Sequence, residues 1–182
     1  MNSSIKPLDI NLLRKSARQH MEEGAVTAGY SADRTEVIAM LNSALATELV
    51  CVLRYRRHHF MASGIHSHAT AAEFLVHSNE EQGHADQLAE RIVQLGGEPD
   101  FSPDSLTRRS HAEYVEGVTL GDMIRENLVA ERIAIDSYRH AIESLGSDDP
   151  TTCRLLESIL AVEEEHADEL ADLLTQVPVK SS

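Results

Sequence analysis

The sequence predicts an all-α protein: a four-helix bundle made of two antiparallel helical hairpins joined by one long crossover, with a short extra N-terminal helix. Three observations predict this fold. The chain of 182 residues contains little glycine or proline and no tryptophan, four long segments have helical patterning, and one motif occurs twice, about eighty residues apart. This length suits a single domain with one core.

The N-terminal part is expected to be an extension of the bundle. Residues 8–21 (LDINLLRKSARQHM) form a brief amphipathic stretch followed by a loop, so we assign residues 1–32 to this extension. The first long helix begins with a capping box, because Asp33 and Glu36 lie three residues apart just before VIAML. It is expected to end at Gly64.

The second and third long helices have clear boundary signals. The second is expected to start near Ser67 and to end at Gly96, after QLAERIVQL. The third is expected to start after Thr119, with Asp122 three residues further on, and to end before Gly146.

The fourth long helix opens with Asp149 as its cap and Pro150 at its first position, and it fades near Gln176. We therefore expect the bundle domain to span residues 33–176, followed by a short C-terminal tail, 177–182.

The connections predict the topology. The first and last joins are short, so each helix pair is an antiparallel hairpin. The middle connection, EPDFSPDSLTRRSHAEYVEGVT, is too polar and proline-broken for a fifth core helix, although RRSHAEYVE could form a turn or two. A helix of ~28 residues measures ~42 Å. About twenty extended residues can cover that length, so the hairpins are joined by a long crossover.

Composition narrows the classes of partner. A net charge of −14 disfavours nucleic acid or anionic membrane and suits cations. We find no apolar run of the ~20 residues that span a bilayer, and the N-terminus lacks the apolar core of a signal peptide. A cytoplasmic protein with no membrane partner is expected. Cys51 and Cys153 are expected to be reduced, as is usual in a cytosol. The predicted topology places them ~20 Å apart along the bundle axis, so an intrachain disulfide is not expected.

The repeated motif reads EEQGHADQLAE in the second helix and VEEEHADELAD in the fourth. Each copy has one Glu-x-x-His pair: Glu81 with His84, and Glu163 with His166. Residues three apart share a helix face, so each pair can hold one ion. One such pair is expected by chance in a chain this rich in glutamate and histidine. Two pairs at equivalent positions indicate a metal site.

A shift of 83 residues also places Glu131 on Glu48 and Tyr138 on Tyr55. The two hairpins therefore look like copies related by an approximate two-fold axis. Both glutamates lie on apolar helix faces, where a carboxylate is costly unless it is paired, protonated or ligating. The alternative is a glutamate at the edge of the stripe that reaches water, but two at equivalent positions favour ligation.

A dinuclear metal centre is thus predicted from six side chains on four helices: Glu48, Glu81, His84, Glu131, Glu163 and His166. Four carboxylates and two imidazoles are the arrangement of di-iron carboxylate bundles. Oxygen and nitrogen donors suit iron or manganese, and zinc can compete. We expect iron, with manganese or zinc as substitutes.

From about Asp33 to Leu174, roughly three quarters of the chain, the sequence resembles bacterioferritin and its relatives in the ferritin-like superfamily. The segments that carry the resemblance are LNSALATELVCVLRYRRHH, EEQGHADQLAERIVQLGGEP, NLVAERIAIDSYRHAI and ILAVEEEHADEL. All six ligand positions match.

The resemblance implies roles for these residues. Glu81 and Glu163 would bridge the two irons, and the other ligands would complete one ion each: Glu48 with His84, and Glu131 with His166. Tyr55 matches a tyrosine beside the family's site that donates an electron or a hydrogen bond; an ordinary core tyrosine is the alternative. Tyr138 is expected to be structural.

Two departures from bacterioferritin matter. Gln82 stands where that family has its haem-ligating methionine, so no haem is expected. Too few residues follow the fourth helix to form the fifth helix of 24-subunit ferritins. That truncation resembles the mini-ferritins, or Dps proteins, so a homo-oligomeric cage of twelve subunits is favoured and one of twenty-four is the alternative.

The remaining basic and histidine residues are expected to have structural or surface roles. The stretch RYRRHHF, with His66, His68 and His77, could suggest a second metal site but is expected to form surface and subunit interfaces. DNA binding is not expected, because the net negative charge outweighs the four N-terminal cations: Lys6, Arg14, Lys15 and Arg18.

The sequence therefore predicts a ferroxidase that oxidises Fe(II) with O2 or H2O2 at Glu48, Tyr55 and the other site residues and stores iron in a cage. One alternative is a non-storing di-metal enzyme, similar to rubrerythrin peroxidase or manganese catalase, although the chain lacks the four-cysteine module of rubrerythrins. Another is a bundle with structural metal, or a DNA-compacting cage.

Overall fold

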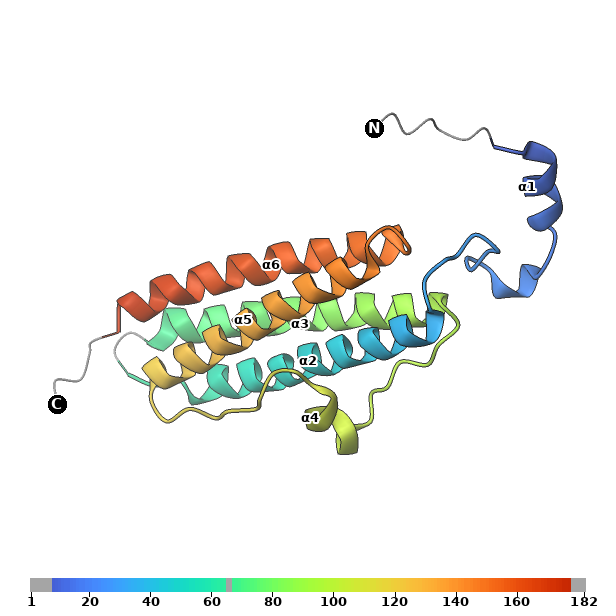
Figure 1. Ribbon diagram of the computed structural model, residues 1–182. Helices are drawn as coiled ribbons and strands as arrows, with labels where there is room; N and C mark the ends of the chain where they lie inside the picture. The colour runs from blue at the N-terminus through green and yellow to red at the C-terminus, as the bar shows by residue number, and fades with distance from the viewer. Residues whose placement is uncertain (1–7, 65–66, 178–182) are drawn as a thin grey trace, which may run out of the picture.

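The computed structural model describes residues 8–64 and 67–177, and within them the chain contains helices and no strand. Four long helices form the bundle (Figure 1): α2 (Arg34–Met61), α3 (Ser67–Gln94), α5 (Leu120–Leu145) and α6 (Pro150–Thr175). The predicted all-α four-helix bundle is confirmed, with boundaries close to those expected.

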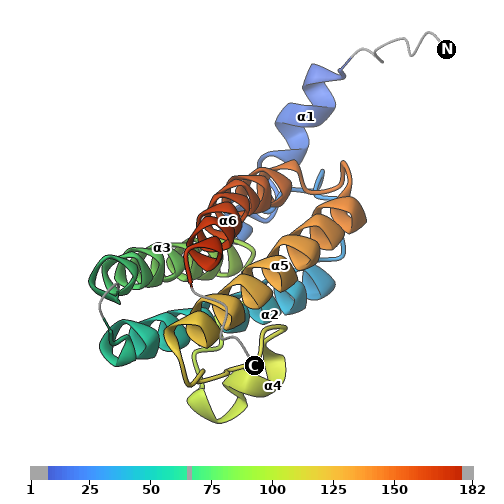
Figure 2. The ribbon, with the colours of Figure 1, turned by 90° about the vertical axis from the view of Figure 1, so that its left-hand side faces the viewer.

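The two hairpins lie side by side, as Figure 2 shows along the bundle axis. Helix α2 packs against α3 and α5, and α6 packs against α5 and α3. The long connection runs back along α2, so α2 and α6 are parallel and so are α3 and α5 (Figure 1). In this arrangement, one face of each helix points toward the central axis of the bundle.

The helix starts are capped as predicted. Asp33 accepts two backbone N–H bonds at the start of α2. Thr119 and Asp122 form a complete capping box at the start of α5. Asp149 caps α6, with Pro150 at the first helical position. These caps satisfy backbone donors that the first turn leaves without partners.

Asp149 also ties one end of the bundle together. Arg91 of α3 donates to both of its carboxylate oxygens at 2.9 Å, and the Tyr30 hydroxyl donates to one of them at 2.9 Å. Burial alone would raise the pKa of Asp149, but the hydrogen bonds from Thr152, Tyr30 and Arg91 lower it on balance. The carboxylate is therefore an ionised anchor that joins α3, α6 and the segment before α2.

Two short elements differ from the expectation. The N-terminal helix α1 covers Ile10–Ser16 instead of residues 8–21; it stands off the bundle in Figure 1 and buries no side chain. In the crossover, the 3-10 turn η2 (Pro103–Ser105) leads into α4 (Leu106–Arg109), which precedes most of the predicted RRSHAEYVE turn. Leu106, which is buried against α2, sets the position of this turn.

Part of the RYRRHHF stretch is internal, so its assignment to the surface is wrong for two residues. Arg54 is buried and donates from Nε to Asn127 Oδ1 at 2.9 Å and from Nη1 to the Glu113 carbonyl at 3.0 Å. His58 is buried too, and its ring nitrogens contact Asn127 and the Glu116 carbonyl. Both residues hold the crossover and α5 to α2.

The core contains two large apolar clusters, one toward each end of the bundle, and a small third cluster around Leu106. The first includes Leu41, Leu88 and Leu156, and the second includes Phe74 and Leu170. The buried ionisable residues lie between them. By length and composition alone, α2 is apolar enough to cross a membrane, which the sequence analysis did not predict. In this structure α2 is a core helix of the bundle, and half of its most apolar 18-residue window is buried.

Both cysteines are free and buried. Cys51 packs in the second apolar cluster. Burial raises the pKa of its thiol well above the usual value, so it is a neutral core residue.

Candidate metal centre

The six predicted side chains meet in the middle of the bundle. None is more than 5 % exposed. Helices α2 and α5 contribute one glutamate each, and α3 and α6 contribute a Glu-x-x-His pair each: Glu48, Glu131, Glu81 with His84, and Glu163 with His166. Four separate helices therefore converge on one point.

Their ligand atoms form two overlapping groups. The first comprises Glu48, His84 and two shared glutamates, and the second comprises Glu131, His166 and the same two glutamates; within each group the ligand atoms lie within 4.8 Å of one another. The shared residues are Glu81 and Glu163. This is the geometry of two neighbouring metal positions with two carboxylates between them.

The distances between histidine nitrogens and carboxylate oxygens in the centre are similar to those between two ligands of one metal ion. His84 Nδ1 lies 2.9 Å from Glu163 Oε1 and 3.4 Å from Glu81 Oε2. His166 Nδ1 lies 3.7 Å from Glu81 Oε1. Two donors that each lie about 2.1 Å from one ion are about 3.0–3.5 Å apart, so little movement would be needed to enclose cations.

The buried polar atoms of the centre lack hydrogen-bond partners. Even the close His84 and Glu163 atoms do not meet in hydrogen-bonding directions. Among the described residues, nine buried side-chain atoms lack a partner; one is Asn127 Nδ2, and the other eight belong to the six clustered side chains. These eight are Glu48 Oε2, both Glu81 oxygens, His84 Nδ1, Glu131 Oε2, both Glu163 oxygens and His166 Nδ1. Each unpaired buried group costs about 1–3 kcal/mol. Metal ions would satisfy all eight, so the residues fit a dinuclear metal group.

Protonation differs among the carboxylates. Burial raises the pKa of Glu48 and of Glu163 well above the usual value, and the neighbouring carboxylate of Glu81 raises both further. Burial alone would raise the pKa of Glu81, but the close polar groups of Glu48 and the two site histidines lower it on balance. One carboxylate thus keeps its charge while its neighbours hold protons.

The histidines show the opposite tendency. Burial alone would lower the pKa of His84 and His166, but the close carboxylates of the surrounding glutamates raise the two pKa values to about 10 and about 9. In the metal-free centre, protons therefore occupy sites where cations would bind.

Two tyrosines connect the halves of the centre in a symmetric way. The Tyr55 hydroxyl of α2 donates to Glu131 Oε1 on α5, and the Tyr138 hydroxyl of α5 donates to Glu48 Oε1 on α2. Burial raises the pKa of both hydroxyls well above the usual value, so both remain donors. The sequence analysis assigned only a structural role to Tyr138, although the 83-residue shift that pairs it with Tyr55 was the available signal.

Two further residues touch the centre and were missed. Glu80 Oε2 accepts a hydrogen bond from His166 Nε2 at 2.9 Å. His77, which was expected at a surface or interface, is fully buried. Its ring stacks on that of His166 with centroids 4.0 Å apart, and its Nδ1 lies 3.2 Å from the Tyr55 oxygen. His77 precedes Glu81 by one helical turn, which was its sequence signal.

The other histidines of that group do not join the centre. His68 is exposed, and His59 donates from Nδ1 to the Ala71 carbonyl at 2.7 Å. His66 lies outside the described residues, as does Lys6 of the N-terminal cations.

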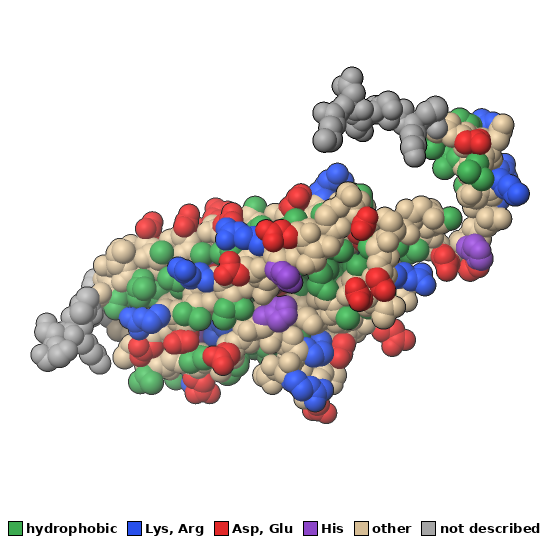
Figure 3. Space-filling model, in the orientation of Figure 1, with side chains coloured by type: hydrophobic (Ala, Val, Ile, Leu, Met, Phe, Trp, Pro, Cys, Tyr) green, Lys and Arg blue, Asp and Glu red, His purple; other side chains and the backbone are tan. Residues whose placement is uncertain are grey.

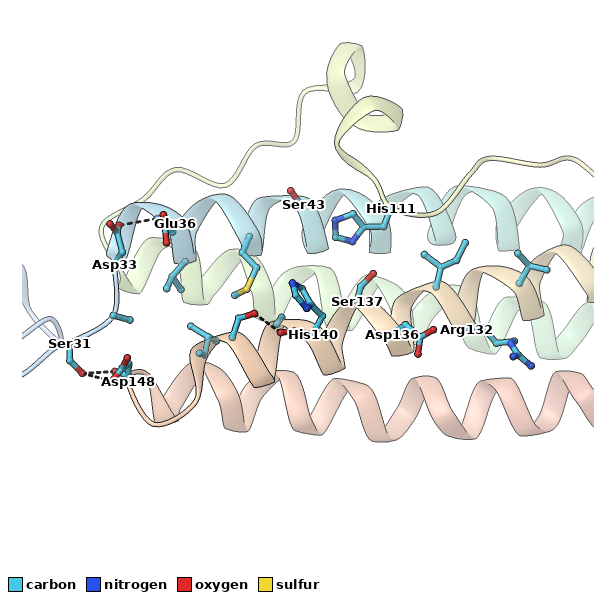
Figure 4. Close-up of a pocket in the computed structure, with 18 residues that line it drawn as sticks. Ser31, Asp33, Glu36, Ser43, His111, Arg132, Asp136, Ser137, His140 and Asp148 are labelled. Carbon is cyan, nitrogen blue, oxygen red and sulfur yellow. Dashed lines mark hydrogen bonds between the residues drawn. The ribbon is translucent and has the colours of Figure 1, made fainter.

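A large groove lies elsewhere, between α2 and α5, with a volume of about 1040 Å³ (Figure 4). His111 of the crossover and His140 of α5 point into it from opposite sides, and none of the six clustered side chains lines it. On the face drawn in Figure 3, acidic and basic side chains are interspersed and the basic ones do not gather into a patch.

The fold and these side chains place the protein in the class of four-helix bundles with a carboxylate-rich core. A model of the ferritin-like domain matches residues 38–179. The chain therefore belongs to the ferritin-like family, and its relatives are of the bacterioferritin and Dps type, as the sequence resemblance implied.

Three comparisons illustrate this relationship. The bacterioferritin of Desulfovibrio desulfuricans is 30% identical over 141 residues, covering 76% of this chain and 75% of the relative. A nutrient stress-induced DNA-binding protein of Nostoc is 34% identical over 141 residues, covering 75% of this chain and 76% of the relative. The structure of a dodecameric thioferritin, the bacterioferritin-related protein of Bacteroides fragilis, has a TM-score of 0.77 and 30% identity, covering 80% of this chain and 88% of the other.

Proposed function

We propose that this protein is a ferroxidase that oxidises Fe(II) at a dinuclear centre within each subunit and stores the product iron in a protein cage. The observation that carries the proposal is the pair of overlapping ligand groups that share Glu81 and Glu163. Their unpaired buried atoms favour cations at both positions.

In this proposal, the shared glutamates bridge two iron ions that are the substrate. One ion takes Glu48 and His84, and the other takes Glu131 and His166. Carboxylate oxygens and imidazole nitrogens suit first-row metals, so manganese and zinc are expected to bind as substitutes.

The chemistry is a two-electron oxidation. Two Fe(II) ions give up one electron each, and together they reduce one O2 to H2O2, or one H2O2 to two water molecules, with two protons consumed in either case. Bound iron supplies the electrons; the protein holds the two ions at adjacent positions and neutralises the charge of the product.

The tyrosines support the ligands in this scheme. By donating to Glu131 and Glu48, the hydroxyls of Tyr55 and Tyr138 fix which carboxylate oxygen faces the metal. Glu80 orients the His166 ring by accepting a hydrogen bond from its Nε2, which leaves Nδ1 free to bind iron.

For storage, the proposal includes a homo-oligomeric cage, and twelve subunits are favoured over twenty-four. The similarity to a dodecameric thioferritin supports this size.

The test combines particle size with iron uptake. The full-length protein is sized by multi-angle light scattering, then given Fe(II) and either O2 or H2O2 while ferric absorbance is followed in the near ultraviolet. A cage that retains far more iron than two ions per chain is the expected result. A dimer that saturates at two metals per chain would refute storage and favour a catalytic di-metal enzyme.

The isosteric variant Glu81→Gln with Glu163→Gln tests the centre itself. It keeps the volume of both bridging side chains and removes their charge, so rapid oxidation should be lost. A matched control is Glu90→Gln with Glu157→Gln, which changes two exposed glutamates on the same helices. Equal oxidation rates in the two variants would contradict the assignment.

A further inference from the structure

A second set of metal-ligating side chains lies on the face between α3 and α6. Glu73 and His77 are one turn apart on α3, and Glu169 comes from α6. His77 Nε2 lies 2.9 Å from Glu169 Oε2 and 3.7 Å from Glu73 Oε1. The imidazole is buried, while the two carboxylate side chains are 43% and 39% exposed.

We propose that Glu73, His77 and Glu169 form a third site, which binds a divalent first-row metal ion from solvent beside the dinuclear centre. One imidazole and two carboxylates are a donor set for Fe(II), Mn(II), Co(II) or Zn(II). The separations of 2.9 and 3.7 Å bracket the distance between two donors about 2.1 Å from one ion.

The tautomer of His77 supplies an independent reason for a cation at this place. This step rests on the proposed function, in which Glu131 is an ionised ligand and therefore accepts the one hydroxyl hydrogen of Tyr55. The Tyr55 oxygen can then only accept from His77 Nδ1, 3.2 Å away. Neutral histidine has one N–H, so its proton is on Nδ1.

The consequence falls on the other ring nitrogen. In this tautomer, the lone pair of His77 Nε2 faces the oxygens of Glu169 and Glu73, and three electron-rich groups repel one another unless a cation lies between them. The cation is either a proton on Nε2 or a metal ion. Orientation of a ligating histidine by a hydrogen bond to its second nitrogen is usual at metal sites.

This site is not part of the duplicated centre. The shift that maps the first Glu-x-x-His pair onto the second places Ile159 at the position of His77, Leu155 at Glu73, and Gln87 at the counterpart of Glu169. Ile159 is buried in the apolar core. The other half of the bundle therefore has no equivalent donor set, and duplication of the hairpin does not explain these three residues.

The position of the site indicates what a bound ion would do. His77 stacks on His166, so the third ion would lie one imidazole away from the metal position formed by Glu131 and His166. With three protein donors and open access to solvent, it would bind more weakly than the buried pair. It would hold a ferrous ion in reserve next to the centre.

The experiment counts bound Co(II), which air does not oxidise readily in such sites, on the metal-free full-length protein by titration calorimetry at neutral pH. The test variant is Glu73→Gln with Glu169→Gln, and the control is Glu90→Gln with Glu157→Gln, whose residues are also exposed. The native protein and the control should bind one more ion per chain than the test variant. Anomalous diffraction from Co(II)-soaked crystals should place that ion beside His77 Nε2.

Other results are equally decisive. Equal Co(II) counts for the native protein and the Glu73→Gln, Glu169→Gln variant would mean that a proton alone occupies the place, and would overturn the proposal. The variant Glu81→Gln with Glu163→Gln separates it from the proposed function. If that variant keeps every ion of the native protein while the first variant still loses one, the dinuclear centre fails and the third site stands.

Discussion

The metal-free centre stores unfavourable energy that metal should release, and the variant Glu81→Gln with Glu163→Gln tests this directly. All four carboxylate oxygens of these residues are buried without hydrogen-bond partners, and each costs about 1–3 kcal/mol. Glutamine keeps the side-chain volume, removes the charge and adds N–H donors for the remaining carboxylates. It also removes anionic partners of the protonated His84 and His166, which offsets that gain. The comparison that tests the centre is therefore the rise in Tm that metal gives to each protein.

Metal should stabilise the native protein far more than the variant. At a free metal concentration a hundred times Kd, each occupied site adds about 2.7 kcal/mol to the free energy of unfolding, so the two positions add about 5 kcal/mol. For a chain of this length 1 kcal/mol raises Tm by about 2–4 °C. The native Tm should rise by roughly 10–20 °C, and the variant should lose most of that rise.

The assay is differential scanning calorimetry with and without Zn(II), at equal protein concentration because the protein is expected to assemble. The Glu90→Gln, Glu157→Gln protein is the control and should respond like the native chain. A variant that retains the full metal-induced rise in Tm would refute the reasoning.

Three more predictions follow from the structure. The pKa values of about 10 and about 9 for His84 and His166 lie above 6.5, the value of a free histidine. Their contribution to the stability of the metal-free protein is thus complete below pH 6.5 and is lost as pH rises toward 9–10. Metal affinity should increase over the same window, by up to about tenfold per pH unit for each proton displaced, and calorimetry in buffers of different ionisation enthalpy should detect proton release; pH-independent affinity would contradict the assigned protonation. Tyr138→Phe removes a hydrogen bond to a ligand and should weaken metal binding by about 10–100-fold, measured by competition with a chelator; unchanged affinity would show that the hydroxyl does not support the site. Arg91→Ala leaves the buried Asp149 without its cationic partner and should cost about 3 kcal/mol in urea unfolding, whereas metal stoichiometry should not change.

Much of the bundle could be predicted because its signals are local in sequence. Caps at Asp33, Thr119 and Asp149 act within one turn of the chain, so residue type alone indicates where α2, α5 and α6 begin. The short joins and the long crossover restrict the topology in the same way. The short elements were harder. Helix α1 buries none of its apolar side chains against the described part of the chain, and α4 is positioned by the contact of Leu106 with α2.

The six clustered residues could also be predicted, since each hairpin contributes three of them at equivalent positions. One Glu-x-x-His pair carries little information, but two pairs and two glutamates under nearly the same shift specify a shared centre. The approximate two-fold relation then requires the two halves to face each other. Only the coordinates, however, show that Glu81 and Glu163 belong to both ligand groups.

Taken alone, the sequence determined the helices, their order and the residues that duplication marks. The tertiary structure decided the contacts that break the duplication. His77 and Glu80 have no counterparts in the second hairpin, so no repeat pointed to them. Their importance depends on the rotation of α3 against α6, which stacks His77 on His166 and brings Glu169 to Nε2 of His77. Periodicity assigns a residue to a helix face, but the partner of that face is a distant segment. That pairing is settled when all four helices pack together.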